Sequence, residues 1–226
     1  MGFGQVIGEL LPSAIGAALS PIPIIAVVLM LMSPAASRTT PGLALGWIVG
    51  LAAATTVVVL VADPAGAGHE GAQPVVGWIK AALGVLFLMM AAGQWRKRPV
   101  PGQAPELPGW MAAIDRLSSG TAFGLGVLLS AANPKNLTLA VAAALAIGRS
   151  GLGGGATAGA IAVFVALGSV TVAGPALAYL ALRDKVQARL LSAKDWLVHE
   201  NATVMFVVLL VLGVVLIGKG IAIVTG

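Results

Sequence analysis

Ser20-Pro21-Ile22-Pro23 interrupts an apolar run that extends from Phe3 to Met32. Two prolines two residues apart remove two backbone donors, and their rings clash with the preceding turn, so a continuous helix cannot pass through. A second interruption, Ala131-Ala132-Asn133-Pro134-Lys135-Asn136, lies in another long apolar run. Inside a membrane, freed backbone groups are tolerated only where they are buried in protein or line a cavity. Paired interruptions in the two halves of a chain therefore point to a transporter binding site.

The composition is typical of an integral membrane protein. Of the 226 residues, 58% are hydrophobic and only 9% are charged, and the mean hydropathy is +1.00. Soluble domains carry about a quarter charged residues. Several apolar runs reach the roughly 20 residues that a helix needs to cross a bilayer. We therefore expect an all-α membrane protein.

Several functions are disfavoured by what the sequence lacks. There is no Walker A motif, which argues against ATP hydrolysis, and no cysteine for disulfide exchange or thiolate metal binding. His69 and His199 lie in different loops, so we expect no metal site and no cofactor. No nucleophile–base pair is apparent, so an enzyme is not expected. The net charge of +5 falls between the apolar runs, which is typical of membrane loops and not of a nucleic-acid-binding face.

Six transmembrane helices are expected from the apolar runs, with the first and the fourth broken at the two interruptions. They cover about residues 6–32, 42–62, 75–95, 119–147, 156–182 and 202–224. The loops on one side of this arrangement then hold nine basic residues and those on the other side hold one. The nine are Arg38, Arg96, Lys97, Arg98, Arg116, Arg183, Lys185, Arg189 and Lys194, and the one is Arg149. By the positive-inside rule, both termini are expected outside.

Two halves of three spans form the expected organisation. Residues 1–95 make the first three-helix repeat, residues 96–118 a basic, proline-rich cytoplasmic linker, and residues 119–226 the second repeat. Because three is odd, the halves run in opposite directions across the membrane, which gives an inverted repeat. Leu83-Gly84-Val85-Leu86 also resembles Leu212-Gly213-Val214-Val215, although matches this short arise by chance in such apolar sequence.

The segment near residues 183–200 has the pattern of an amphipathic helix. Apolar residues recur there every three or four positions, with Arg, Asp, Lys and Gln between them. Such a helix is suited to lie in the membrane interface. A plain cytoplasmic extension of the fifth span is the alternative, and the sequence leaves both open.

The two interruptions supply the candidate substrate-binding residues. Asn133, Lys135 and Asn136 lie near the middle of the fourth span, where a lysine is costly and usually faces a cavity or a partner. Lys135 beside a helix break would meet unsatisfied carbonyl groups, which favour a cation. It then either attracts an anionic head group or only caps the broken helix. The residues expected in this site are Ser20, Pro21, Pro23, Asn133, Pro134, Lys135 and Asn136.

Glu9, Lys80 and Lys219 form a second candidate set. Under the expected topology each lies a turn or two from the outer face, on the first, third and sixth spans. Pairing between Glu9 and either lysine would offset the cost of removing these charges from water. The set could act in gating or proton coupling, or it could be an ion pair that joins helices beside a lysine that reaches the interface.

These features together resemble a known family. The Pro-x-Pro break in the first half, the Asn-Pro-Lys-Asn break in the second, six spans and a basic proline-rich linker look like the lysine-exporter superfamily. Within it, the chain is most similar to the GAP family of actinobacteria, the sulfolipid-addressing or peptidoglycolipid-addressing proteins. This resemblance covers essentially the whole chain. It implies export of cell-envelope lipids or glycolipids, and it implies that the residues of the two breaks line the central pathway.

The sequence and the resemblance together give one leading expectation and one rival. The leading expectation is a bacterial plasma-membrane transporter that exports an envelope lipid, a glycolipid or a small polar metabolite by alternating access, driven by an ion gradient. The rival is a non-transporting accessory subunit of a lipid-synthesis or export complex. The expected partners are membrane lipids and the lipid or small-molecule substrate, with a second copy of the chain as a further candidate and no nucleic acid.

Overall fold

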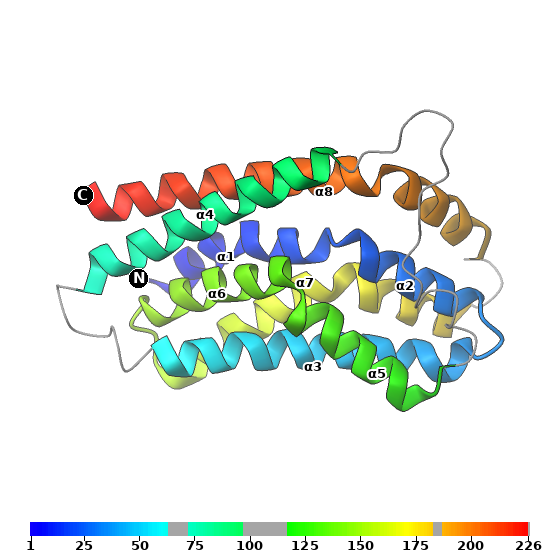
Figure 1. Cartoon of the computed structure of the whole chain (residues 1–226). Coiled ribbons are helices and arrows are strands. Elements are labelled where there is room, and N and C mark those ends of the chain that lie inside the picture. Colours follow the sequence, from blue (N-terminus) through cyan, green and yellow to red (C-terminus); the bar gives the residue numbers. More distant parts are fainter. Residues whose placement is uncertain (63–71, 97–116, 183–186, 226) are drawn as a thin grey trace.

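The computed structural model describes residues 1–62, 72–96, 117–182 and 187–225, and within these ranges the chain is helical with no strand (Figure 1). The elements, in order, are α1 (Phe3–Ala18), α2 (Pro21–Met32), α3 (Ala36–Ala62), α4 (Ala72–Arg96), α5 (Ser119–Val127), the π-helical turn η3 (Leu128–Ala132), α6 (Pro134–Gly148), α7 (Gly154–Leu182) and α8 (Gln187–Thr225). The expected all-α fold is confirmed for these residues.

Four of these helices, α3, α4, α7 and α8, are long and apolar enough to cross a membrane. Helices α1 and α2 pass the same test as a pair and are bent by 52° at the break between them, which gives a fifth span if the pair is counted as one. The remaining apolar helices, α5 with η3 and α6, are shorter. The chain is therefore a multi-pass membrane protein by the length and composition of its helices.

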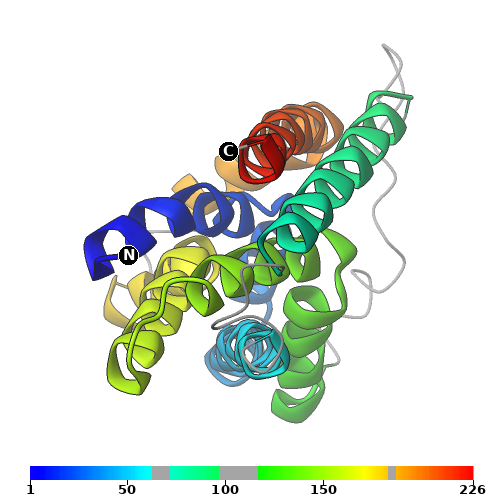
Figure 2. The same cartoon turned by 90° about the vertical axis from the view of Figure 1, so that its left-hand side faces the viewer.

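The helices form three groups across the bundle. Helices α4 and α8 lie side by side on one flank, α3 and α5 lie on the opposite flank, and α1, α2, α6 and α7 lie between them (Figures 1 and 2). Both ends of the chain lie at the same end of the bundle, on the left in Figure 1. The first helix break lies within the central group, and the second lies where the chain passes from α5 on the flank to α6 in the centre.

Glycines allow α3 and α5 to approach closely. A Cβ atom at Gly42 would lie 2.6 Å from the Ser119 carbonyl oxygen, and one at Gly46 would overlap the backbone of Phe123. A Cβ at Gly126 would in turn overlap the Leu43 carbonyl oxygen. The two backbones are thus in direct contact, as small residues allow in membrane bundles.

The pair α4 and α8 is built in the same way. A Cβ at Gly84 would lie 2.7 Å from the Gly213 carbonyl oxygen, and one at Gly213 would lie 3.0 Å from the Gly84 carbonyl oxygen. Gly77 and Gly220 face each other in the same reciprocal manner. The two segments that resemble each other in sequence therefore pack against each other.

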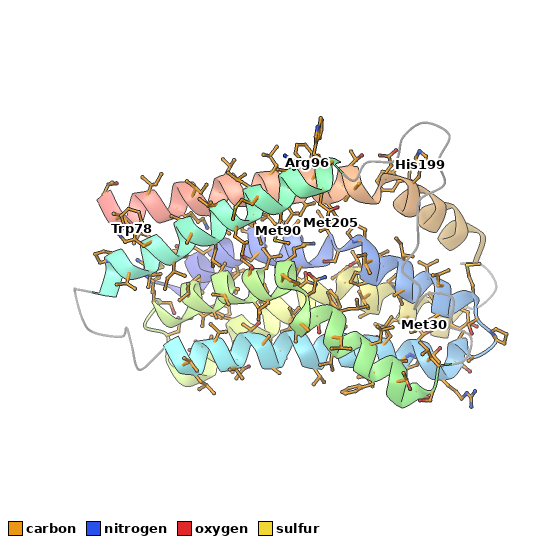
Figure 3. The ribbon with its side chains drawn as sticks, in the orientation of Figure 1. Met30, Trp78, Met90, Arg96, His199 and Met205 are labelled. Atoms are coloured by element: carbon orange, nitrogen blue, oxygen red, sulfur yellow. The ribbon has the colours of Figure 1, made fainter. Side chains whose placement is uncertain are left out.

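Apolar side chains fill the space between the groups. Val6, Leu10 and Phe164 are fully buried together with alanines of α6. Met90 and Met205 pack from α4 and α8 against a buried cluster that includes Phe87 and residues of α1 and α6 (Figure 3). The termini of the α4 span carry Trp78 and Trp95, which are both exposed, as expected of aromatic residues near membrane surfaces.

Two expected boundaries are wrong. The loop expected to carry Arg38 is shorter, because α3 begins at Ala36 and Arg38 is an exposed helical residue. Residues 187–200 belong to α8, which continues without interruption into the last span, so they form neither a separate interfacial helix nor an extension of the fifth span. The hydrophobic periodicity predicts a helix, and this is confirmed, but a periodic pattern does not reveal which neighbouring span the helix joins.

Other expectations concern parts of the chain that the structure does not describe. The linker at 96–118 falls mostly in the undescribed range 97–116, and His69 falls in 63–71. Five of the nine basic residues used for the orientation, together with the side chains of Arg189 and Lys194, are also outside the described part; the five are Lys97, Arg98, Arg116, Arg183 and Lys185.

Candidate functional site

The first break exposes backbone carbonyl groups at the end of α1. In a continuous helix, the carbonyls of Ala17 and Leu19 would accept hydrogen bonds from the nitrogens of residues 21 and 23. These residues are Pro21 and Pro23, which have no N–H group. Both prolines are buried, so water cannot generally replace the missing N–H donors. Each freed carbonyl therefore needs a partner from elsewhere in the protein.

Side chains provide these partners. Lys135 Nζ donates to the Leu19 carbonyl oxygen at 2.8 Å, and Ser20 Oγ lies 2.8 Å from the Ala17 carbonyl oxygen. The positive charge of Lys135 thus sits at the carboxyl end of α1, where the helix dipole favours a cation. The expectation that Lys135 meets carbonyl groups at a helix break is confirmed, although the carbonyl belongs to the other break.

Helix α7 supports the same junction. Thr171 Oγ1 donates to the Ala18 carbonyl oxygen at 2.6 Å, and Trp47 Nε1 donates to the Gly168 carbonyl oxygen at 3.3 Å, which ties α3 to α7 one turn away. Sequence reasoning missed Thr171. The available signal was a hydroxyl inside the apolar fifth span, but threonine commonly bonds to its own helix and such a residue does not stand out.

The second break is organised around Asn133 and Asn136. Helix α5 widens into the π-helical turn η3 before Pro134, and Asn136 Nδ2 donates to the Leu129 carbonyl oxygen in that turn at 2.9 Å. Asn133 begins α6 as its N-cap, with Oδ1 accepting from the Lys135 backbone nitrogen at 3.0 Å. Asn is a favoured N-cap residue and Pro is favoured at the first helical position.

The two breaks meet in one buried polar cluster. Lys135 Nζ donates to Ser20 Oγ at 2.8 Å, and Ser20 Oγ lies 3.0 Å from Asn136 Oδ1. The three residues, which we call the break cluster, are 1%, 3% and 0% exposed in the order Lys135, Ser20, Asn136. The structure therefore brings together polar residues that are more than 110 positions apart.

The chemistry of the break cluster is that of a buried cation held by neutral oxygen atoms. The described residues provide acceptors for two of the three N–H groups of Lys135, a carbonyl and a hydroxyl, and none of them forms an ion pair with it. A buried ammonium group with no carboxylate beside it interacts favourably with an incoming anion. Such an arrangement can bind an anionic group if the surrounding helices open.

The second candidate set also comes together. Glu9 Oε2 lies 3.9 Å from Lys80 Nζ, and Lys219 lines the same small cavity as both residues. Lys80 is buried, and the Glu9 side chain is 31% exposed. We call these three residues the Glu9 cluster. It lies at the end of the bundle where the chain begins and ends, as the expected positions on the first, third and sixth spans require.

No metal centre is formed within the described ranges. They contain no group of three or more His, Asp or Glu side chains close enough to hold an ion. His199 is exposed on α8, away from both clusters (Figure 3).

Comparison with known families gives one match. A model of the family described as "Sap, sulfolipid-1-addressing protein" matches residues 10–222. Searches of curated proteins and of solved structures gave no significant match. The matched range begins within α1, ends within α8 and includes both breaks. The chain therefore belongs to the sulfolipid-1-addressing protein family.

Proposed function

We propose that this protein is a transporter that exports an anionic or polar lipid of the cell envelope, or a related small polar molecule, by alternating access. The observation that carries the proposal is the break cluster, in which two discontinuous helices from opposite halves of the chain share a buried cation. Discontinuous helices of this kind form the substrate sites of many secondary transporters. The description of the family as addressing a sulfolipid supports an anionic lipid cargo.

In this proposal Lys135 exchanges partners during transport. In the conformation described here it is closed off, with its charge held by the Leu19 carbonyl and the Ser20 hydroxyl. Opening of the bundle would let an anionic head group replace these neutral acceptors, and a hydrogen bond between two oppositely charged groups gains more Coulomb energy than one to a neutral oxygen. Return of Lys135 to the end of α1 would then release the cargo. Asn133 and Asn136 would contribute amide groups, and the prolines would keep the two breaks in place.

We further propose that six spans form two inverted three-helix repeats and that the chain belongs to the lysine-exporter superfamily. Two pairs of contacts between helices support the repeat. Helix α3 packs on α5 as α7 packs on α1, and α3 packs on α6 as α7 packs on α2. Gly84 and Gly213, which correspond in the two halves, face each other as residues near a two-fold axis do. On this basis α5, η3 and α6 together make the fourth span.

The proposed orientation places both termini outside the bacterial plasma membrane. Both ends lie at one end of the bundle, which is compatible with an even number of crossings (Figure 1). Arg38 and Arg96 lie at helix ends that would face the cytoplasm, as the positive-inside rule favours. Glu9 is the proposed residue for proton coupling, since it is the acidic side chain that lies well inside a described span. The protein is proposed to act without enzymatic activity.

Reconstitution tests the proposed function. The purified protein would be placed in liposomes with a fluorescent sulfated glycolipid, and its transfer to the other leaflet would be measured as accessibility to a membrane-impermeant quencher. We expect wild type to accelerate transfer and Lys135→Met to abolish the acceleration. Arg38→Gln serves as the control, because it also removes one positive charge but lies on an exposed helix end. Equal transfer by wild type, Lys135→Met and empty liposomes would refute the proposal.

One observation favours the second candidate function, a non-transporting accessory subunit. Helix α8 continues for 15 residues ahead of the apolar stretch that begins at Ala202, which provides a helical arm for a partner protein. The same experiment separates the two functions. Transfer by the purified chain alone contradicts the accessory role, whereas transfer that requires a co-purified partner supports it.

A further inference from the structure

Glu9 and Lys219 line two adjoining cavities at the end of the bundle where the chain begins and ends. The larger, of about 400 Å³, is bounded by Met1, Gln5, Gly8, Glu9 and Lys219. The smaller, of about 20 Å³, lies between α1, α4, α6 and α8 and is also lined by Lys80. A volume of this size holds about one water molecule. Glu9 and Lys219 therefore separate an open vestibule from a narrow space that leads to a buried lysine.

The charges around these cavities do not balance within the described residues. Lys80 is buried and lies 3.9 Å from Glu9, which is long for a direct hydrogen bond. In the part of the chain that the structure describes, no carboxylate lies within 4.0 Å of Lys219. Within the described residues, one carboxylate thus accompanies two lysines, and a buried lysine so far from its counter-ion is stabilised by any further anion.

We infer that the vestibule is a second binding site, which takes an anionic head group such as a sulfate ester, a phosphate or a carboxylate. Lys219 makes the first contact from the vestibule, and Lys80 then exchanges Glu9 for the ligand. The inference rests on the proposed function in one respect, since it places this site at the exit side of the export pathway. The binding itself requires no transport, so it can be tested separately.

The role of Glu9 gives this site an unusual signature. If the vestibule binds an anion, Glu9 competes with the ligand for Lys80, because both are negatively charged and the cavity beside the lysine has a volume of only about 20 Å³. Removing the charge of Glu9 should therefore strengthen binding of an anion. If Glu9 and Lys80 are only an ion pair that joins α1 to α4, the same change should destabilise the protein and leave binding unchanged or weaker.

Native mass spectrometry of the detergent-purified protein measures this binding directly. The probes are sulfatide and galactosylceramide, which differ by one sulfate ester, with inorganic sulfate as a competitor. We expect wild type to bind sulfatide in preference to galactosylceramide. Lys219→Gln should weaken sulfatide binding about tenfold, as expected for the loss of one charge-assisted contact, and Glu9→Gln should strengthen it. Arg38→Gln, at an exposed helix end, should leave it unchanged.

Competition by inorganic sulfate tells whether the site recognises the charged group alone or the lipid as a whole. Displacement of sulfatide by sulfate at millimolar concentration indicates a site for the anion, and resistance to sulfate indicates that the acyl chains contribute most of the affinity. Either result is compatible with the inference if the effects of Lys219→Gln and Glu9→Gln have opposite signs. Equal binding of both lipids, or the same sign for both variants, would overturn it.

A further variant keeps this inference distinct from the proposed function. Lys135→Met alters the break cluster, which shares no residue with the vestibule. It should abolish transfer and leave sulfatide binding at the vestibule in place. Loss of vestibule binding in Lys219→Gln with transfer retained would contradict the exit-side role only. Size-exclusion profiles of each variant verify that the fold is kept.

Discussion

At the residue scale, Lys135 acts as a helix cap that comes from a distant part of the chain. Its ammonium group satisfies the Leu19 carbonyl, which Pro23 deprives of its usual donor. The position of Lys135 in a break was predictable from the sequence, as was its preference for carbonyl groups. The acceptor of its hydrogen bond was not predictable, because every residue has a backbone carbonyl and the sequence does not single out that of Leu19. Identifying it requires knowing that the two breaks lie together in the fold.

A double-mutant cycle tests whether Lys135 and Ser20 act together. We expect Lys135→Met and Ser20→Ala to be non-additive in the free energy of unfolding, with a coupling of about 0.5–3 kcal/mol, the range found for groups in one hydrogen-bond network. Unfolding would be followed by circular dichroism during denaturation with dodecyl sulfate.

The cycle is more informative than Lys135→Met alone, because that substitution has two opposing effects on the free energy of unfolding. It removes the cost of burying a charge and it also removes the hydrogen bonds, so the two effects can cancel. A parallel cycle of Lys135→Met with Thr55→Val serves as control. Thr55 is buried and bonds within its own helix, so additivity is expected there. Additivity in both cycles would show that Lys135 and Ser20 contribute independently to the free energy of unfolding.

At the element scale, the break between α1 and α2 depends on the two prolines. With Pro21→Ala and Pro23→Ala together, both nitrogens regain an N–H group, so the helix can continue and the carbonyls of Ala17 and Leu19 regain backbone partners. We expect the bend of 52° to decrease. By the helical rise of 1.5 Å per residue, straightening lengthens the distance from one end of the pair to the other by about 4 Å.

Electron paramagnetic resonance measures this distance between spin labels introduced as Phe3→Cys and Pro34→Cys. Both positions are exposed and flank the α1–α2 pair, and the chain has no native cysteine to interfere. An unchanged distance in the proline variant would mean that tertiary contacts set the bend. Lys135 and Thr171 would then be responsible for the bend through their bonds to the end of α1.

Glycines set the spacing of α3 and α5, and a matched pair of substitutions tests this. A Cβ at Gly126 would lie 2.7 Å from the Trp47 backbone nitrogen and would overlap the Leu43 carbonyl, whereas one at Gly124 would meet nothing within 4 Å. Gly126→Ala should destabilise the protein by about 1–3 kcal/mol, as overpacking does. Gly124→Ala should be neutral or stabilise the helix by up to about 1 kcal/mol.

Thermal unfolding in detergent compares the two glycine variants. Because Gly124 and Gly126 lie two residues apart on the same helix, replacing either by alanine should change the helix propensity of α5 by a similar amount. Equal melting temperatures would contradict a direct backbone contact between α3 and α5.

The elements themselves were largely predictable because both breaks contain proline, whose effect on a helix is local. The boundaries that failed depend on tertiary structure. Residues 187–200 belong to α8 because the helix continues through Asn201 into the apolar stretch. The charged residues in this segment do not prevent it from forming one helix with the last span. The π-helical turn before Pro134 was also not predicted. It connects α5 to α6, so it depends on how these two helices are placed in the fold.

At the scale of the whole molecule, the fold places two helix breaks and two pairs of glycine-packed helices around a shared centre. Helix α4 packs on α8 and α3 packs on α5, and the polar contacts between the two breaks lie among the helices between these pairs. The presence of a proline-containing break in each of two apolar runs was predictable from the sequence. The contact between the two breaks was not predictable, because it depends on how the helices pack. The spacing of residues along the sequence does not determine that packing.

The central claim is that the break cluster is the point at which access alternates between the two sides of the membrane. Ser20→Cys tests it most directly, since sulfur replaces the oxygen that contacts Lys135 and Asn136 and no other cysteine is present. Labelling by a membrane-impermeant thiol reagent would be measured in vesicles of both orientations, with and without a sulfated glycolipid. We expect labelling from each side, with the lipid changing the two rates in opposite directions. Labelling from neither side, or from one side only whether or not the lipid is present, would contradict it.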